Sequence, residues 1–247
     1  MKALAGNAYA GISDATTLNF TTTDASGAIV VAPTNSLTFA DLGRDMATIG
    51  DFNGDGYDDF VIAAPRSQDS SSAAFVVYGN ANGTVPDLSG GTIAASAGFK
   101  MLSAGTNDYF GYAVNSAGDA NGDGLADLVV TNKYGTNLAG ESAFVVFGKS
   151  NASTVYGNSL NFSNGLAAGL GYQIKTDETY FGDEVSNAGD VNGDGLSDLL
   201  VTSDHNQPRN VYVIYGKTGN QAITMTSYTQ FTPDLGYNVL SGNVNDL

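Results

Sequence analysis

Three short stretches of this 247-residue chain repeat one pattern of oxygen-bearing side chains. Each reads Asp-x-Asn-x-Asp-Gly-x-x-Asp, and they begin at Asp51, Asp119 and Asp190. Oxygen donors stand at positions 1, 3, 5 and 9, and the glycine at position 6 permits the positive φ of a sharp turn. Because Ca²⁺ takes about 6–8 oxygen ligands, each stretch is a candidate calcium loop.

The nine positions resemble the start of an EF-hand calcium loop, with two departures. Position 12 holds Ile62, Val130 or Val201, where an EF-hand has a bidentate glutamate. The residues that follow the loop are apolar and often β-branched, which favours a strand over a helix. We therefore predict a hairpin loop between two strands, closed by the aspartate at position 9. Asp, Asn and Gly also favour metal-free turns, but three identical ligand sets favour calcium.

The composition excludes several other kinds of chemistry. The chain has no cysteine, which removes disulfides, thiolate metal sites and cysteine nucleophiles. Its one histidine, His205, lies in a polar Asp-His-Asn-Gln-Pro turn and is expected to be a surface residue, not a catalytic base. We find no set of residues able to do catalysis and predict that the chain is not an enzyme.

The charge of the chain limits its partners. There are 9 basic and 25 acidic residues, which give a formal net charge of −16. Nucleic acid is not an expected partner, because phosphate binding needs a basic face, and an anionic membrane surface is excluded for the same reason. No stretch approaches the ~18 apolar residues of a membrane span, so membrane insertion is not expected.

The loops belong to a longer repeat that extends in both directions. A Phe-Gly or Leu-Gly pair lies upstream of each loop, and an apolar run ending in glycine lies downstream. The upstream segments are residues 42–46, 110–114 and 181–185, and the downstream segments are residues 75–79, 144–148 and 212–216. Each unit holds about four short apolar or alternating runs bounded by Gly, Asn and Asp, which indicates strands.

The repeat predicts an all-β fold class, with one four-stranded antiparallel sheet in each unit. We find no convincing stretch with the 3.6-residue period of a helix. Four-stranded units repeated around an axis are the blades of a β-propeller. A β-sandwich is the competing architecture, but it does not normally repeat one strand-loop-strand pattern at such regular spacing.

The order of motifs resembles a known repeat. Phe-Gly, then the aspartate-rich loop, an apolar strand and Ala-Pro is similar to the FG-GAP repeat of integrin alpha subunits, over roughly residues 37–247. The resemblance implies a β-propeller in which the loop between the first two strands of a blade binds Ca²⁺. The sequence departs from the pattern because Ala64-Pro65 occurs only in the first copy, and Leu42 replaces phenylalanine there.

The resemblance also implies three calcium sites, one in each loop. Four side chains and the carbonyl group at position 7 would be the ligands of each ion. The implied ligand sets are Asp51, Asn53, Asp55, Tyr57 and Asp59; Asp119, Asn121, Asp123, Leu125 and Asp127; and Asp190, Asn192, Asp194, Leu196 and Asp198.

The repeats divide the chain into five segments. We expect an N-terminal segment with an outer strand of a preceding blade, three blades, and the first strand of a truncated further blade. These segments are residues 1–36, 37–103, 104–175, 176–233 and 234–247. Because roughly 4–8 blades close a propeller, three blades predict a partial propeller, whose open blade edges allow self-association.

The sequence favours a calcium-binding adhesion or recognition module, secreted or on the cell surface. Its expected ligand is an extracellular protein or glycan. Extracellular calcium modules bind with Kd of about 10⁻⁴–10⁻³ M, so their surroundings keep them filled. The alternative is a non-catalytic accessory propeller of a secreted hydrolase or lyase.

Overall fold

The structure is a computed structural model, and it describes residues 41–65, 72–88, 90–103, 108–133, 141–162, 165–176, 180–203, 210–225 and 234–240. The expected N-terminal segment, residues 1–36, lies outside the described residues, and so does His205. Residues 241–247, the last part of the expected truncated blade, lie outside them as well.

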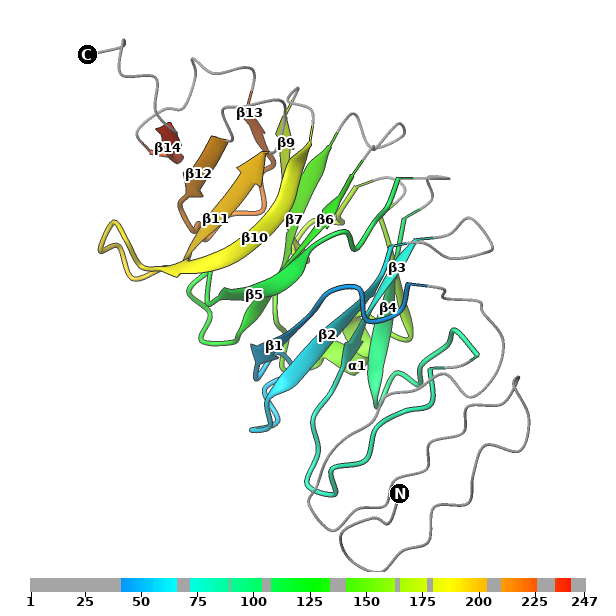
Figure 1. The fold of residues 1–247 in the computed structure, drawn as a ribbon. Helices are drawn as coiled ribbons and strands as arrows, with labels where there is room; N and C mark the ends of the chain where they lie inside the picture. Colours follow the sequence, from blue (N-terminus) through cyan, green and yellow to red (C-terminus); the bar gives the residue numbers. More distant parts are fainter. Residues whose placement is uncertain are drawn as a thin grey trace, which may run out of the picture.

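The described residues form three sheets and one short helix (Figure 1). The first sheet contains, in spatial order, β1 (Met46–Gly50), β2 (Asp59–Ala64), β3 (Ala73–Val77), β4 (Gly98–Leu102) and β8 (Ser159–Asn161). The second contains β5 (Val114–Gly118), β6 (Asp127–Asn132), β7 (Ser142–Val146), β9 (Gly171–Thr176) and β13 (Ile223–Met225). The third contains β10 (Phe181–Gly189), β11 (Asp198–Ser203), β12 (Asn210–Ile214) and β14 (Gly236–Leu240).

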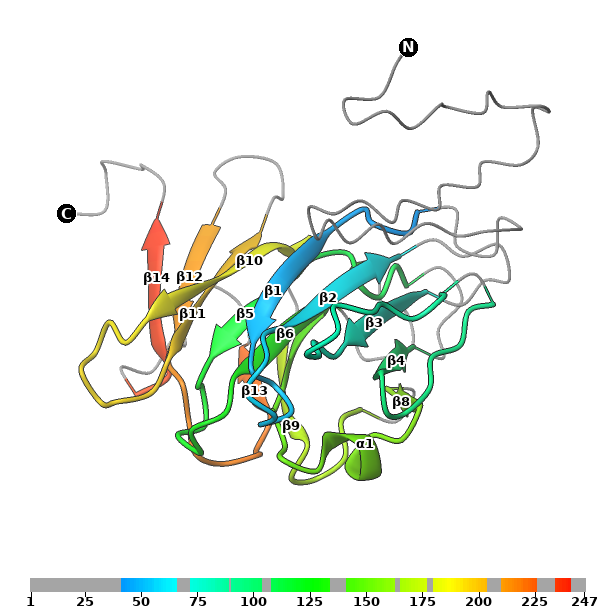
Figure 2. The same cartoon turned by 90° about the horizontal axis from the view of Figure 1, so that it is seen from below.

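The sheets are arranged as propeller blades. In each, the four strands contributed by its own repeat pair antiparallel, and the three sheets stand side by side with their first strands β1, β5 and β10 in contact (Figure 2). The predicted all-β fold, a partial propeller, is confirmed. The helix α1 (Ala152–Val155) has 4 residues, and no helix in the described ranges is long and apolar enough to cross a membrane.

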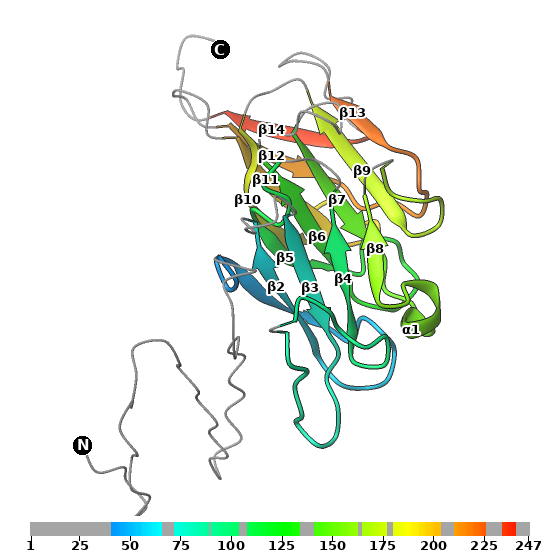
Figure 3. The ribbon, with the colours of Figure 1, turned by 90° about the vertical axis from the view of Figure 1, so that its right-hand side faces the viewer.

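Two of the sheets have a fifth strand, which the prediction of four strands per unit did not include. Strand β8 lies in the connection between β7 and β9, yet it pairs in parallel with β4 of the preceding sheet. Strand β13, from the connection between β12 and β14, pairs in parallel with β9 in the same way (Figure 3). Each repeat therefore completes the outer edge of the repeat before it.

The prediction that residues 234–247 begin a further blade was wrong. Strand β14 pairs antiparallel with β12, from Asn210 opposite Leu240 to Ile214 opposite Gly236, and is the fourth strand of the third sheet. The physical reason lies in its first residue. Gly236 has φ of +134°, close to the +145° and +144° of the glycines that open β4 and β9. This left-handed backbone favours glycine and marks the start of a fourth strand.

The hydrophobic core lies between the sheets and reaches into the loops. The central strands β2, β3, β6 and β7 are buried along almost their whole length, because each of their faces is covered. Phe52, at position 2 of the first loop, is fully buried beside Phe99 and Tyr156. The rings of Phe99 and Tyr156 stack with centroids 4.5 Å apart. The core therefore anchors the beginning of the loop.

Candidate metal-binding loops

Each aspartate-rich stretch is the hairpin loop between the first two strands of its sheet. The loops close at Gly50 opposite Asp59, Gly118 opposite Asp127, and Gly189 opposite Asp198, each at a shift in strand register. A strand starts at the position-9 aspartate in all three repeats, as the sequence predicts. The three loops lie at the same end of their sheets (Figure 1).

The aspartate at position 1 folds the loop around its own carboxylate. In the first loop, Asp51 Oδ1 accepts the N–H of Asp55 at 3.0 Å, and Asp51 Oδ2 accepts the N–H of Gly56 at 2.9 Å. Asp119 and Asp190 accept the N–H groups of positions 4, 5 and 6 at 2.7–3.1 Å. The same side chain thus organises all three loops.

Glycines at positions 4 and 6 make this wrapping sterically accessible. Gly54, Gly122 and Gly193, at position 4, have φ between +74° and +80°. The position-6 glycines have φ of +87° to +89°. Two left-handed residues so close together turn the backbone N–H groups inward, and side chains other than glycine rarely adopt this conformation.

The side chains at positions 3 and 5 form the outer part of the loop. In the first loop, Asn53 Oδ1 accepts the N–H of Asp55 at 2.8 Å, and Asn53 Nδ2 donates to Asp55 Oδ2 at 3.0 Å. Asn192 and Asp194 repeat both contacts in the third loop. These positions are exposed or half-buried, so their oxygens are within reach of a cation from solvent.

The second loop differs at the same positions. Asn121 is buried and its Nδ2 donates to both carboxylate oxygens of Asp127 at 3.2 Å. Asp123 lies 3.4 Å from the Lys149 ammonium group. In the second loop the asparagine side chain therefore contacts the position-9 aspartate, and the position-5 aspartate contacts a lysine, whereas in the other two loops they contact each other.

The aspartate at position 9 has a second role, which the sequence analysis missed. Asp59 is fully buried, and its Oδ2 accepts the N–H of Phe52 at 3.0 Å while its Oδ1 accepts the N–H of Gly79 at 2.8 Å. Asp127 and Asp198 make the corresponding contacts, with Gly148 and Gly216 as the second donors. The carboxylate thus connects the start of the loop to the glycine two residues after the third strand.

The glycine in this contact is required for steric reasons. A Cβ atom on Gly79, Gly148 or Gly216 would collide with the carbonyl oxygen of position 8 in the same repeat. The sequence contains a signal for this contact, because an aromatic residue and then glycine end the third-strand run in all three copies.

Burial and neighbouring charge both act on the position-9 carboxyl groups. Burial raises the pKa of Asp59 to about 6, against the opposing effect of the backbone N–H groups of Gly79, Asn53 and Phe52. Burial, and to a smaller extent the nearby carboxylates of Asp123 and Asp119, raises the pKa of Asp127 to about 7 against the opposing effect of two backbone N–H groups. A cation in the loop would relieve this repulsion and favour the ionised forms.

The donor set fits a hard divalent cation. Each loop contains three carboxylates, one amide oxygen and the backbone carbonyl of position 7, with no nitrogen or sulfur ligand. Within the described ranges, no three Asp, Glu or His side chains already converge on one point. The carboxylates instead accept hydrogen bonds from the loop itself, and some oxygens, such as Asp119 Oδ1 and Asp190 Oδ1, accept two.

Successive loops are joined to each other through backbone hydrogen bonds. Ala126 N–H donates to Asp51 O at 3.3 Å, and Lys149 N–H donates to Phe52 O at 2.9 Å. In the same manner the third repeat donates to the second, from Ser197 to Asp119 O and from Lys217 to Ala120 O. The carbonyl groups of positions 1 and 2 are therefore acceptors for the following repeat.

A polar groove of about 540 Å³ lies at the opposite end of the first strands. Arg44 stacks on the ring of Tyr112 at 3.9 Å and donates to the Tyr112 carbonyl, and Lys133 lies 4.1 Å from the same ring. Lys133 also pairs with Asp183. The groove is lined by Arg44, Asp45, Tyr112, Ala113, Asn115, Asp183, Glu184 and Val185. All three repeats contribute to it.

Comparison with known proteins shows a match between two segments of this chain and one family of repeats. A sequence profile of the FG-GAP repeat matches residues 43–85 and 110–156. Similar curated proteins include integrin alpha-4 of Xenopus laevis, 30% identical over 115 residues, which cover 45% of this chain and 10% of that protein. Integrin alpha pat-2 of Caenorhabditis briggsae is 34% identical over 90 residues, 36% of this chain and 7% of that protein.

A third integrin alpha chain is similar to this chain at a comparable level of identity. Integrin alpha-E of Mus musculus is 33% identical over 102 residues, which cover 39% of this chain and 8% of that protein. The chain therefore spans a tenth or less of the length of these relatives. The profile matches the first two repeats, and the third repeats their loop and its hydrogen bonds.

Proposed function

The chain carries FG-GAP repeats and resembles integrin alpha chains, and on this basis we propose that it is a calcium-binding adhesion or recognition module that works outside the cell. Three Ca²⁺ ions brace the loops at one end of the blades. The ends of the first strands on the opposite side contact an extracellular protein or glycan. In this proposal the module binds and does not catalyse.

Each ion is held by one loop. Its ligands are the side chains of positions 1, 3, 5 and 9 and the carbonyl group of position 7, which in the second loop are Asp119, Asn121, Asp123, Asp127 and Leu125. Calcium supplies positive charge among carboxylates that otherwise repel one another. Three ions would reduce the formal charge of the chain from −16 to −10.

The observation that carries the calcium proposal is the recurrence of one hydrogen-bond pattern in all three loops. A carboxylate at position 1 accepts N–H groups from positions 5 and 6 in every copy, although the residues at positions 2, 7 and 8 differ. Three aspartates and one asparagine recur at the same positions in every copy. The repeated donor set therefore supports a shared ligand, and its chemistry favours Ca²⁺.

The groove is the proposed recognition surface because its residues differ among the repeats. The residue after the Phe-Gly or Leu-Gly glycine is Arg44 in the first repeat, Tyr112 in the second and Asp183 in the third. Structural positions, such as the loop glycines, keep one residue type instead. These different side chains give the groove its own chemical character, and binding residues are often held in place by a rigid scaffold.

A thermal melting experiment tests the calcium part. Binding to the folded state alone stabilises it by about 2.7 kcal/mol per site at a hundredfold excess over Kd. We expect the melting temperature to fall strongly when EGTA replaces Ca²⁺, and Mg²⁺ to restore less of it, because Mg²⁺ demands a smaller octahedral site. A melting curve that responds to neither EGTA nor added Ca²⁺ would show that the loops bind no calcium.

Binding assays test the recognition part. The calcium-loaded chain is applied to a glycan array and to immobilised extracellular-matrix proteins. We expect binding that is lost in the double variant Arg44→Ala, Glu184→Ala and kept in Ser153→Ala, whose exposed side chain lies on α1. Equal binding by all three proteins would place recognition elsewhere.

A further inference from the structure

Equivalent residues of the three repeats differ in exposure in a regular way. The side chain at position 2 of the loop is 0% exposed in Phe52 and Ala120 but 47% exposed in Val191. The second residue of the fourth strand shows the same difference. It is 1% exposed in the second repeat, as Tyr172, and 45% exposed in the third, as Tyr237. In the first two repeats the following blade covers these positions, whereas the third repeat has no described blade after it.

The two internal interfaces show what covers such a surface. The following repeat donates two backbone N–H groups to the carbonyls of positions 1 and 2, as described above. It also places the side chain of its position 7 against the position-4 glycine of the preceding loop. A Cβ atom on Gly54 would lie 3.2 Å from Leu125 Cδ2, and one on Gly122 would lie 2.8 Å from Leu196 Cδ2.

We call the corresponding surface of the third repeat the tail face, formed by Gly189, Asp190, Val191, Gly193 and Tyr237. Among the described residues, none donates to the carbonyl oxygens of Asp190 and Val191. Cβ atoms on Gly189 and Gly193 would meet nothing within 4 Å. The tail face therefore has two free acceptors and two open niches where the first two repeats are covered.

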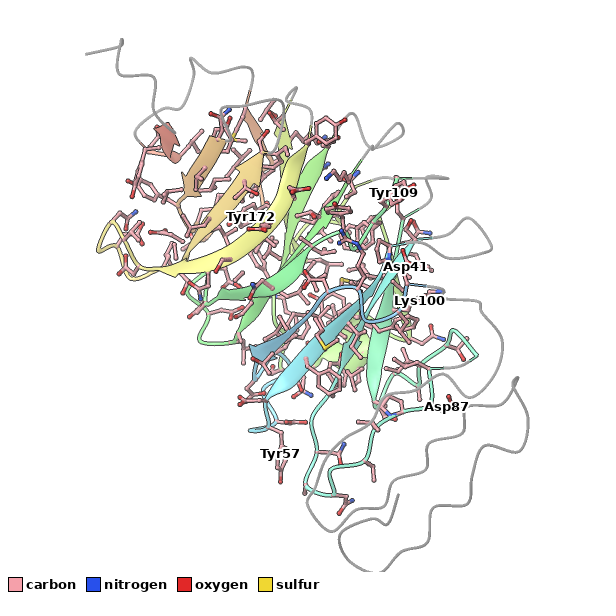
Figure 4. The ribbon with its side chains drawn as sticks, viewed as in Figure 1. Asp41, Tyr57, Asp87, Lys100, Tyr109 and Tyr172 are labelled. Atoms are coloured by element: carbon pink, nitrogen blue, oxygen red, sulfur yellow. The ribbon has the colours of Figure 1, made fainter. Side chains whose placement is uncertain are left out.

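The first repeat presents the complementary surface, which we call the head face, formed by Tyr57, Asp58 and Asn80. Asp58 and Asn80 are the counterparts of the donors Ala126 and Lys149, yet their N–H groups make no hydrogen bond in the described part of the chain. Tyr57, at position 7, is 44% exposed and projects from its loop away from the sheets (Figure 4). Within the described ranges, the head face therefore has two backbone donors without a partner and one exposed aromatic side chain.

We propose that the head face of one copy of this chain docks on the tail face of a second copy. The internal interfaces assign the contacts. Asp58 N–H donates to Asp190 O, Asn80 N–H donates to Val191 O, and Tyr57 of one copy covers Gly193 of the other. A second copy is the occupant because this one chain carries both complementary surfaces, at opposite ends of its row of blades (Figure 1).

The contact is heterologous, because it joins two different surfaces. Heterologous contacts close into a ring when the rotation per subunit fits a whole turn. The described residues of two copies form six blades, within the roughly 4–8 that close a propeller. The expected product is therefore a dimer with two head-to-tail contacts. The charge of −16 on each copy opposes this dimer, so added salt should strengthen it by screening.

Sedimentation velocity of the full chain tests the proposal, in Ca²⁺ and in EGTA. We expect a concentration-dependent dimer that Tyr57→Asp and Val191→Asp each abolish and that Val155→Asp keeps. Val155 is an exposed residue of α1 outside both faces. A mixture of the Tyr57→Asp and Val191→Asp variants should associate through the one contact that is unaltered in the mixed pair, more weakly than the natural chain but more than either variant alone. A chain that stays monomeric in both conditions overturns the proposal, and so does a mixture that fails to associate.

Cross-linking gives a second measurement that does not depend on these variants. The chain has no cysteine, so the double variant Tyr57→Cys, Val191→Cys introduces the only thiols. On oxidation we expect a covalent dimer, with much less from the control Tyr57→Cys, Val155→Cys. Equal cross-linking of both double variants, or none of either, would contradict head-to-tail docking. Neither outcome bears on calcium binding, which the melting experiment tests separately.

Discussion

At the scale of single residues, aspartates of the same motif have different environments and structural roles. The carboxylates of positions 1 and 5 face the loop and solvent, whereas that of position 9 is fully buried in all three repeats. Asp127 accepts N–H groups from Ala120 and Gly148 and the side-chain amide of Asn121. Its hydrogen bonds hold the loop to the blade without a metal, so part of its contribution to stability should remain when calcium is removed.

We therefore predict that Asp127→Ala and Asp123→Ala differ in EGTA. Asp127→Ala leaves buried donors unpaired, which costs about 1–3 kcal/mol each, so the free energy of unfolding should fall by roughly 2–5 kcal/mol. Asp123→Ala loses one surface ion pair and one exposed hydrogen bond from the Leu125 N–H, and should cost about 1 kcal/mol or less. Urea denaturation measures both values. Equal losses would mean that position 9 has no bracing role apart from the metal.

At the scale of elements, tight backbone contacts fix how the hairpin loop meets the third strand. The glycine after β3, β7 and β12 donates to the position-9 aspartate and packs against the carbonyl of position 8. No larger residue fits there without moving one of the two strands. The loop and the end of the third strand consequently form one rigid unit in every blade.

Gly148→Ala should disturb this unit in the second blade. The new Cβ would collide with Ala126 O and approach Phe52 O, and overpacking of this kind costs about 1–3 kcal/mol. Gly219→Ala is the matched control, because a Cβ there meets nothing within 4 Å, and it should change stability by less than about 0.5 kcal/mol. Thermal and urea denaturation compare the two. A Gly148→Ala variant as stable as the control would refute the steric requirement.

Local patterns predicted the elements that local chemistry determines. The hairpin loops and the strands after them follow from turn residues and β-branched runs that recur in each copy. Strands β8 and β13 did not follow, because Ser159–Asn161 and Ile223–Met225 are short and pair with a different repeat. Strand β14 was assigned to the wrong blade because Leu235-Gly236-Tyr237 resembles the start of a first strand, while its partner β12 is remote in sequence.

Some contacts of the candidate site could also be predicted from the sequence, and others could not. Contiguous ligands such as Asp51, Asn53 and Asp55 can be read from their spacing, because a single turn brings them together. The bracing contact between Asp59 and Gly79 spans 20 residues and two strands, so no local spacing indicates it. The head and tail faces could not be predicted from the sequence, because equivalent residues of the three repeats differ there in exposure and not in motif.

At the scale of the whole molecule, the blades form a row in which each repeat completes the one before it. The following repeat supplies an outer strand, two backbone hydrogen bonds to the loop, and a side chain over the loop glycine. The three candidate calcium sites are therefore linked through the backbone of neighbouring loops. Calcium in one loop should rigidify the acceptor carbonyls that the next loop uses, while its ligands remain contiguous and local.

A calorimetric titration of Ca²⁺ into the EGTA-stripped chain, compared with the Asp123→Ala variant, tests the central claim most directly. We predict three bound ions for the natural chain and two for the variant, because Asp123 belongs to one loop and the other two ligand sets stay intact. Binding at the remaining sites should be weakened, not lost, since the loops are linked. An absence of saturable binding to the natural chain, or the same stoichiometry for both proteins, would contradict the account.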